Sequence, residues 1–144
     1  MQTVKIRFKK LHPDAVTPKY AKPGDAGMDL VAISVLNVSL EQVSYDTGIS
    51  VEIPEGYVGL IFPRSSIRNY GIVLSNAVGV IDSGYRGSIQ ATFNYYGSTK
   101  QRYTIGDRIG QLVILPYPQV EFEEVEELSE TIRGTGGFGS TGNK

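Results

Sequence analysis

The chain has 144 residues, which is enough for one domain with one hydrophobic core. Its formal net charge of −1 gives no basic surface for nucleic acid, so we expect no nucleic acid partner, although a small phosphorylated ligand would need only a few local cations. The lack of cysteine excludes disulfides, thiolate zinc sites and cysteine nucleophiles, and the single histidine, His12, excludes histidine-based triads and multi-histidine metal sites.

The N-terminal residues contain no long apolar stretch. Neither a signal peptide nor a membrane span is therefore predicted, and we expect no membrane partner. The expected location is cytoplasmic, or the interior of a host cell if a virus encodes the chain.

Apolar and polar residues mostly alternate along the chain with the period of two that is typical of half-buried strands. Near the N-terminus, Val4, Ile6 and Phe8 alternate with basic residues. The same pattern predicts strands at residues 34–40, 48–53, 57–62, 71–75, 88–96, 108–115 and 120–125. The last segment is acidic, so we expect it to be a charged edge strand that resists aggregation.

No amphipathic segment is long enough for a standard helix. One short helical turn is predicted after Ser65 or Ser66, because serine is a favourable N-cap residue. Many short strands at near-regular spacing favour an all-β fold, an antiparallel sandwich or jelly roll. We expect residues 1–132 to form this single β domain.

The C-terminal residues 133–144 are rich in glycine. They cannot bury enough apolar surface to fold alone, so we expect a mobile arm. Its glycine spacing matches a dinucleotide-binding pattern, but no βαβ unit surrounds it and that interpretation is rejected. Arg133, Phe138, Ser140 and Thr141 nevertheless offer the cation, flat ring and hydroxyls that hold a phosphorylated ring compound. Composition alone leaves a disordered tail equally open.

Four other short segments join charged or hydroxylated residues to glycine or proline, at residues 25–30, 63–66, 79–87 and 106–111. Asp82 could activate a water molecule as a general base, or it could be only a turn residue that bonds its own backbone. Tyr85 could equally be a half-buried strand residue. Arg64 and the two serines after it could form an anion site at the helical turn, or an ordinary surface loop.

The order and wording of these four segments and of the tail closely resemble the trimeric dUTPases (deoxyuridine triphosphatases), over essentially the whole chain. The resemblance implies a dUTPase-like β-clip subunit of the jelly-roll kind. It also implies a dUTP diphosphatase that hydrolyses dUTP to dUMP and pyrophosphate by water attack on the α-phosphorus. Such an enzyme limits uracil incorporation into DNA and supplies dUMP for dTMP synthesis.

The resemblance also assigns roles to individual residues. It implies catalytic roles for Asp82, Arg64, Ser65 and Arg133, with Asp82 orienting the water and Ser65 near the oxygen that bridges the α- and β-phosphates. The implied substrate contacts are Ser66, Asn76, Gly79, Val80, Ile81, Tyr85, Gln111, Phe138, Gly139, Ser140 and Thr141.

These substrate contacts divide by the part of dUTP that they would meet. Asn76 and the main chain of a hairpin within residues 74–85 would read uracil, and the Tyr85 ring would leave no room for a 2′-hydroxyl. Phe138 would stack on the base, while Arg133 and the hydroxyls after it would bind the terminal phosphates.

Mg²⁺ is the implied cofactor, bound mostly by substrate phosphates and by waters, with Asp29 acting through water. A role for Asp25 stays open. We interpret Asp107 and Arg108 as a turn residue and a structural ion pair. The resemblance also implies a homotrimer whose sites take the hairpin from one chain, the phosphate segments from a second and the arm 133–144 from a third.

Two alternatives belong to other function classes. A dCTP deaminase shares the fold, but it needs a glutamate ten residues after the aspartate, where this chain has Thr92. A non-catalytic nucleotide-binding or capsid-like β module is the other. The presence of Asp82, Asp29, Arg64 and Arg133 together argues against it, because a site that has lost its activity has no reason to keep them all.

Overall fold

A computed structural model of the protein describes residues 3–98 and 101–142. In this part of the chain there are ten strands and one short 3₁₀ helix, η1. In chain order the elements are β1 (Arg7–Lys10), β2 (Met28–Val31), β3 (Ser34–Val38), β4 (Gln42–Asp46), β5 (Ile49–Glu52), β6 (Tyr57–Phe62), η1 (Ser65–Asn69), β7 (Ile72–Leu74), β8 (Gly79–Ile81), β9 (Gln90–Tyr95) and β10 (Arg108–Pro116).

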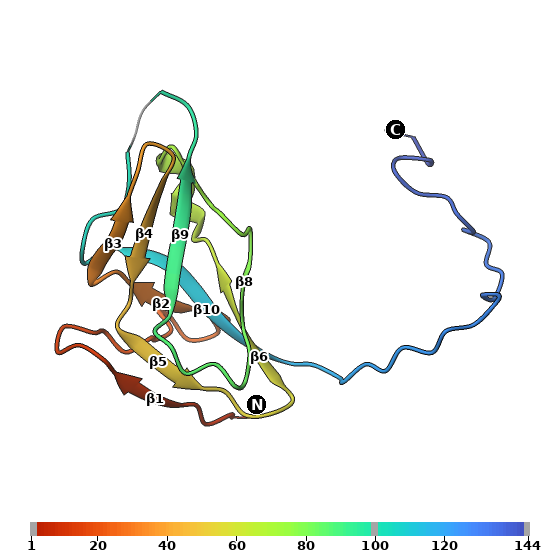
Figure 1. The fold of residues 1–144 in the computed structure, drawn as a ribbon, viewed down its shortest axis with the longest axis horizontal. Coiled ribbons are helices and arrows are strands. Elements are labelled where there is room, and N and C mark those ends of the chain that lie inside the picture. Colours follow the sequence, from red (N-terminus) through yellow and green to blue (C-terminus); the bar gives the residue numbers. More distant parts are fainter. Residues whose placement is uncertain (1–2, 99–100, 143–144) are drawn as a thin grey trace.

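The strands form three antiparallel sheets (Figure 1). One four-stranded sheet has the order β2-β10-β6-β8, the other has the order β3-β4-β9-β7, and β1 pairs with β5. Neighbours in a sheet are mostly not neighbours in the chain, which is the connectivity of a sandwich or jelly roll rather than of simple hairpins. The predicted all-β fold is confirmed.

Three strands were not predicted: β2, β4 and β8. The strands β2 and β8 span only four and three residues, too few for alternation to stand out against neighbouring loops. Strand β4 does carry the signal, because its buried Val43 and Tyr45 alternate with partly exposed polar residues.

The predicted edge strand at residues 120–125 is wrong. Strand β10 ends at Pro116, and the Tyr117 amide still donates to the Gly56 carbonyl oxygen at 2.9 Å. From there the chain runs away from the sheets, and the Phe122 side chain is fully exposed (Figure 1). A strand needs a neighbouring strand to pair with as well as alternating apolar and polar residues. This segment belongs to none of the sheets that the described residues form. The domain boundary at residue 132 stays a prediction.

The core consists of two clusters of buried side chains. One is aliphatic and lies around Leu30, Ile61 and Leu112. The other surrounds Tyr45 and Phe93, whose ring centroids lie 5.9 Å apart with an edge-to-face inclination of 69°. The Tyr45 hydroxyl donates to the Tyr103 carbonyl oxygen at 2.7 Å, and burial raises the pKa of Tyr45 to about 12.

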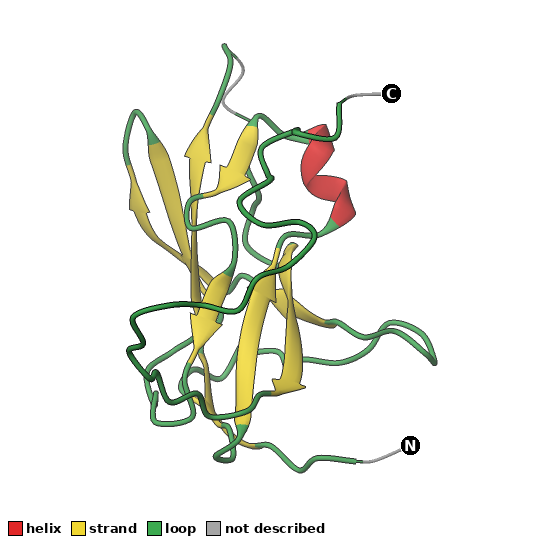
Figure 2. Ribbon diagram, turned by 90° about the vertical axis from the view of Figure 1, so that its right-hand side faces the viewer, coloured by secondary structure: helices red, strands yellow, loops and turns green. Residues whose placement is uncertain are grey.

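The C-terminal segment is drawn as a loop that passes outside the strands (Figure 2). Hydrogen bonds recorded for residues 131–142 join members of that stretch to one another, such as Gly136 N to Arg133 O at 3.0 Å. Among the described residues, no helix has the length and apolar character needed to span a membrane.

We expect Tyr45→Phe to lower the free energy of unfolding by about 1–3 kcal/mol, because the buried Tyr103 carbonyl would lose its donor. Tyr96→Phe is the matched control. The Tyr96 hydroxyl lies 3.4 Å from the Tyr70 carbonyl oxygen on an exposed residue, so its loss should cost less than about 0.5 kcal/mol. Urea unfolding followed by circular dichroism measures both changes.

The same variant tests the raised pKa. Since folding holds the Tyr45 proton more tightly than the ordinary pKa of 10.0 would, stability is fully present below pH 10 and is lost as the pH rises toward about 12. Tyr45→Phe should lose less stability than the wild type over that interval. An equal loss in both proteins would contradict this account.

Candidate functional site

A first cavity, of about 430 Å³, lies on the sheet formed by β2, β10 and β6. Gln111 of β10 is paired with Asp29 of β2 on one side and with Phe62 of β6 on the other. Directly paired residues of antiparallel strands share a face, so the three side chains point the same way. Arg64 and Ser65 follow β6 and line the same cavity. The structure thus brings Arg64, Ser65 and Gln111, which were predicted to serve the phosphates, together with Asp29, which was predicted to act on Mg²⁺ through water.

The Asp29 carboxylate holds two arginines. Its Oδ1 accepts a hydrogen bond from Arg64 Nε at 2.8 Å, and its Oδ2 accepts one from Arg108 Nη1 at 3.1 Å. Only 16% of the Asp29 side chain is exposed, so the two guanidinium groups offset the cost of burying its charge. Asp29 therefore fixes Arg64 at the wall of the cavity. Arg108 forms the ion pair that the sequence indicated, and the Asp107 carboxylate accepts from the Thr104 amide at 2.7 Å in a turn.

Gly27 is a residue of this cavity to which the sequence analysis gave no role. A Cβ atom at Gly27 would lie only 2.2 Å from Gln111 Oε1. The Gln111 side chain occupies that space, and its Nε2 donates to the Pro63 carbonyl oxygen at 3.1 Å. The lack of a side chain at Gly27 therefore leaves the space that the Gln111 side chain occupies. Only the three-dimensional packing reveals this.

The predicted helical turn is present as η1, but the expected serine cap is wrong. The helix begins at Ser65, and Arg64 is the N-cap residue without a side-chain capping bond. The Ser66 hydroxyl instead accepts from Arg64 Nη1 at 3.3 Å. Ser65 is exposed and lines the cavity.

A second cavity, of about 200 Å³, lies beside β8 and contains Asn76, Gly79, Val80, Ile81, Asp82 and Tyr85. Strand β8 pairs with β6 and β7 pairs with β9, so the chain crosses between sheets here and the expected hairpin at residues 74–85 is wrong. The crossing passes through Ala77, which has a left-handed φ of 58°. Because β8 is an edge strand, its outer row of backbone groups is not used by the sheet.

Asp82 directly follows β8 and begins a turn in which the Tyr85 amide donates to the Asp82 carbonyl oxygen at 3.1 Å. The Asp82 side chain is exposed, and the Tyr85 hydroxyl donates to the Ser88 carbonyl oxygen at 2.9 Å. A Cβ atom at Gly87 would lie 2.3 Å from the Tyr85 hydroxyl oxygen. Gly87, which the sequence analysis also missed, therefore leaves the space that the Tyr85 ring needs.

The arm residues lie apart from both cavities. Arg133 Nε donates to the Gly136 carbonyl oxygen at 3.0 Å, within the arm itself. Phe138 is fully exposed and has a left-handed φ of 52°. Gly139, Ser140 and Thr141 follow in turns that bond only locally.

The predicted site residues thus occupy three separate places in one chain. The residues that line the first cavity are all different from those that line the second. In the described part of the chain, no group of three or more His, Cys, Asp and Glu residues could hold a metal ion. A single chain therefore offers a cavity lined by Arg64, an edge strand that ends at an exposed carboxylate, and an arm that lies outside both cavities.

Comparison with known proteins places the chain in a family. The family model for dUTPase matches residues 14–142. Over 143 residues the chain is 46% identical to the deoxyuridine 5'-triphosphate nucleotidohydrolase of Thermobifida fusca, covering 97% of this chain and 80% of that relative. The enzyme of the same name from Escherichia phage T5 is 44% identical, with 96% of this chain and 99% of the relative covered.

Solved structures agree with these sequence relatives. The dUTPase of Staphylococcus bacteriophage 80alpha with dUpNHpp matches with a TM-score of 0.79 and 30% identity, over 97% of this chain and 99% of that one. A variant dUTPase from phage phi11 of S. aureus, described for its coordination of a structural Mg(II) ion, has a TM-score of 0.73 and 27% identity, over 88% of this chain and 100% of that one. From residue 14 to residue 142, this chain is a member of the dUTPase family.

Proposed function

We propose that this protein hydrolyses dUTP to dUMP and pyrophosphate. The observation that carries the proposal is the exposed Asp82 carboxylate at the end of the edge strand β8, with Tyr85 beside it. Relatives that the chain matches over nearly its full length are named for this activity. Since dUTP is an intracellular nucleotide, the cytoplasmic or host-cell location remains part of the proposal.

Uracil binds along β8. Its ring presents two acceptors and one donor in a plane, and the unused backbone groups of Gly79, Val80 and Ile81 offer a complement, as in strand addition to a sheet edge. Asn76, at the wall of the same cavity, adds a side-chain amide. Tyr85 packs against the sugar and excludes a 2′-hydroxyl, which rejects UTP.

Asp82 orients the attacking water and accepts its proton. A new bond forms from the water oxygen to the α-phosphorus, while the bond from that phosphorus to the bridging oxygen breaks and pyrophosphate leaves with the electron pair. Water is a poor nucleophile, and a general base in hydrogen-bond reach contributes about 10²–10⁴-fold.

The first cavity, which Arg64 lines, receives the phosphates. Arg64, Ser65, Ser66 and Gln111 supply a guanidinium, hydroxyls and an amide at one wall. The bridging oxygen gains negative charge as the α-phosphorus is attacked, so a donor from Ser65 at that oxygen stabilises the transition state more than the ground state.

Mg²⁺ fits this donor set only as an ion that the substrate itself helps to bind. The described residues hold no cluster of metal ligands, and Asp29, one of two carboxylates that line the cavity, already bonds two arginines. Asp29 would therefore act through a water of the ion, in keeping with the preference of Mg²⁺ for waters and phosphate oxygens. Such an ion, when bound, neutralises phosphate charge.

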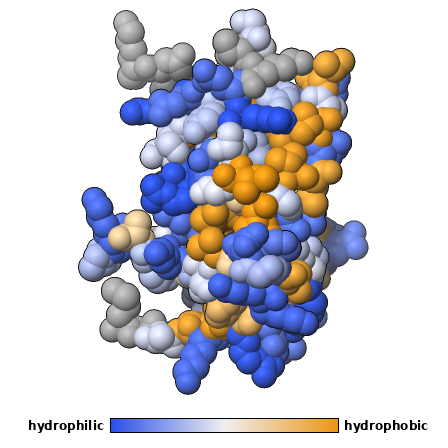
Figure 3. Space-filling model, turned by 90° about the vertical axis from the view of Figure 1, so that its left-hand side faces the viewer, coloured by the Kyte–Doolittle hydropathy of each residue, from blue (hydrophilic) through white to orange (hydrophobic). Residues whose placement is uncertain are grey.

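A homotrimer would bring the three parts together. The arm cannot complete a site while it lies away from both cavities of its own chain, so Arg133, Phe138, Gly139, Ser140 and Thr141 would close the site of a neighbour. Apolar side chains also gather on the face opposite the arm (Figure 3), where β3 exposes Val35, Leu36 and Val38. Contiguous exposed apolar surface is typical of contact regions between proteins.

The two rival functions are less well supported. At the position of the glutamate that a dCTP deaminase needs, Thr92 lies on β9 with its Oγ1 2.8 Å from the Ser44 hydroxyl oxygen. That hydroxyl is part of the sheet surface and offers no acid or base. A non-catalytic module would have no use for the exposed Asp82 next to the cavity beside β8.

Asp82→Asn should lower kcat for dUTP by about 10²–10⁴-fold, because an amide cannot accept the proton. The Kd for dUpNHpp should change by less than about threefold, since binding relies on other groups. Asp14→Asn, at an exposed carboxylate outside both cavities, is the control. Steady-state pyrophosphate release and calorimetric titration measure the two effects, and an unchanged kcat would remove Asp82 from the mechanism.

Deleting residues 133–144 should leave the fold intact, because the hydrogen bonds of the described arm residues reach no further along the chain than Thr131. Turnover should fall by about 10²-fold or more, since the closing groups for the phosphates and base are lost. Circular dichroism and dUTP turnover of the truncated chain check this. Normal turnover by the truncated protein would mean that the arm is only a linker.

Gly87→Ala should displace the Tyr85 ring and weaken discrimination against UTP. The ratio of kcat/KM for dUTP to that for UTP should fall by about tenfold. Gly84→Ala lies in the same turn and its Cβ would meet no atom within 4 Å, so it should leave the ratio unchanged. Equal ratios in both variants would show that the position of the Tyr85 ring does not set sugar selectivity.

A further inference from the structure

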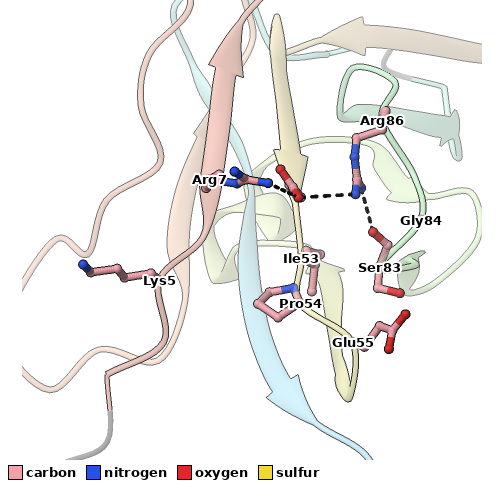
Figure 4. A pocket seen from close by; sticks show the side chains of 9 residues that line it. Lys5, Arg7, Ile53, Pro54, Glu55, Ser83, Gly84 and Arg86 are labelled. Carbon is pink, nitrogen blue, oxygen red and sulfur yellow. Dashed lines mark hydrogen bonds and ion pairs between the residues drawn. The ribbon is translucent and has the colours of Figure 1, made fainter.

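A charged cluster lies behind the turn that carries Asp82. It consists of Arg7 of β1, Glu52 at the end of β5, and Arg86 of the turn, at the wall of a separate cavity of about 370 Å³ (Figure 4). Lys5 and Glu55 also line this cavity. Its three cations and two carboxylates leave little net charge, so the cavity favours no particular class of ligand.

The turn presents different residues to its two sides. Asp82 and Tyr85 line the proposed nucleotide cavity, whereas Ser83, Gly84 and Arg86 line the cavity behind it. Arg86 therefore does not share the cavity in which uracil and the sugar would bind. Its contacts instead run back along the turn and onto β5.

Arg86 ties the turn together through its guanidinium. Its Nη1 donates to the Ser83 carbonyl oxygen at 2.6 Å and to the Tyr85 carbonyl oxygen at 3.0 Å. These bonds hold the Ser83–Gly84 and Tyr85–Arg86 peptide groups in the turn that follows Asp82. Hydrogen bonds from a charged donor are stronger than neutral ones, so one side chain restrains the whole turn.

The turn is anchored to β5 at two points. Arg86 Nη2 lies 3.9 Å from Glu52 Oε1, and the Ser50 hydroxyl donates to the Arg86 carbonyl oxygen at 2.6 Å. Glu52 is shared with Arg7 on the neighbouring strand, and this contact lowers the pKa of Glu52. The carboxylate therefore stays charged at neutral pH and continues to hold Arg86.

We propose that Arg86 is a positioning residue, which holds the Asp82 carboxylate in its catalytic orientation through the Ser83 and Tyr85 carbonyl groups, with Glu52 fixing the guanidinium. This inference rests on the proposed role of Asp82 in dUTP hydrolysis. Because the Arg86 and Glu52 side chains are 53% and 38% exposed, their ion pair adds little to global stability, and its effect is on the turn.

The test compares Arg86→Gln with Arg7→Gln, which removes an equal charge from the same carboxylate without touching the turn. Arg86→Gln should lower kcat for dUTP by about tenfold, with KM and the Kd for dUpNHpp changed by less than about twofold, because β8 is still held by β6. Arg7→Gln should leave kcat within about twofold.

Two further variants separate the parts of the network. Arg86→Lys keeps the charge but loses the planar guanidinium, whose Nη1 bonds both carbonyl oxygens while its Nη2 faces Glu52, so it should restore only part of kcat. Glu52→Gln leaves the Arg86 guanidinium in place without its charged partner and should also give an intermediate kcat. Both remain interpretable if Arg86→Gln fails to fold.

Amide hydrogen exchange supplies a readout that does not depend on turnover. Exchange at Tyr85, whose amide closes the turn, should be about tenfold faster in Arg86→Gln and unchanged in Arg7→Gln. If the wild type does not hydrolyse dUTP, the proposed function fails while the exchange result still reports on the turn. An unchanged kcat in Arg86→Gln, or an equal loss of kcat and of dUpNHpp affinity, overturns the inference.

Discussion

The pairing of β10 with its two neighbours is the constraint on which the rest of the structure depends. On one side it sets Gln111 against Asp29 of β2, and on the other it fixes β6, which leads to Arg64. Strand β6 in turn pairs with β8, whose end carries Asp82. A slip of one residue in this register would turn Asp29 and Gln111 to different faces of the sheet and separate the groups meant for the phosphates.

Within this frame, exposed polar groups are held by contacts that lie behind them. The partly buried Asp29 bonds two arginines and so holds Arg64 at the cavity wall, while the turn after β8 is bonded to β5 on the side away from the proposed nucleotide cavity. The functional groups remain in three places that one chain does not unite. The proposed homotrimer with shared sites would give both the exposed arm and the exposed apolar residues of β3 a role.

The long elements of the fold could be predicted from the sequence because their alternation is sustained, as in β6 and β10. The strand β8 could not be predicted, because alternation over three residues cannot be told from chance. Asp82 nevertheless follows this strand directly. At residues 120–125 the opposite error occurs, because a strand was predicted where none forms. Alternation of apolar and polar residues indicates that a segment can pair as a strand, but it does not show whether another strand lies close enough to pair with it. The roles of Gly27 and Gly87 depend on side chains that reach them only in three dimensions.

The most direct test of this account is a crystal structure of the protein with dUpNHpp and Mg²⁺. We expect the Asp82 carboxylate to bond an ordered water in line with the α-phosphorus and opposite the leaving group. Arg64 should contact the phosphates, with Phe138 of a neighbouring chain over the base. An Asp82 side chain turned away from the nucleotide, with no water opposite the leaving group, would contradict the central claim.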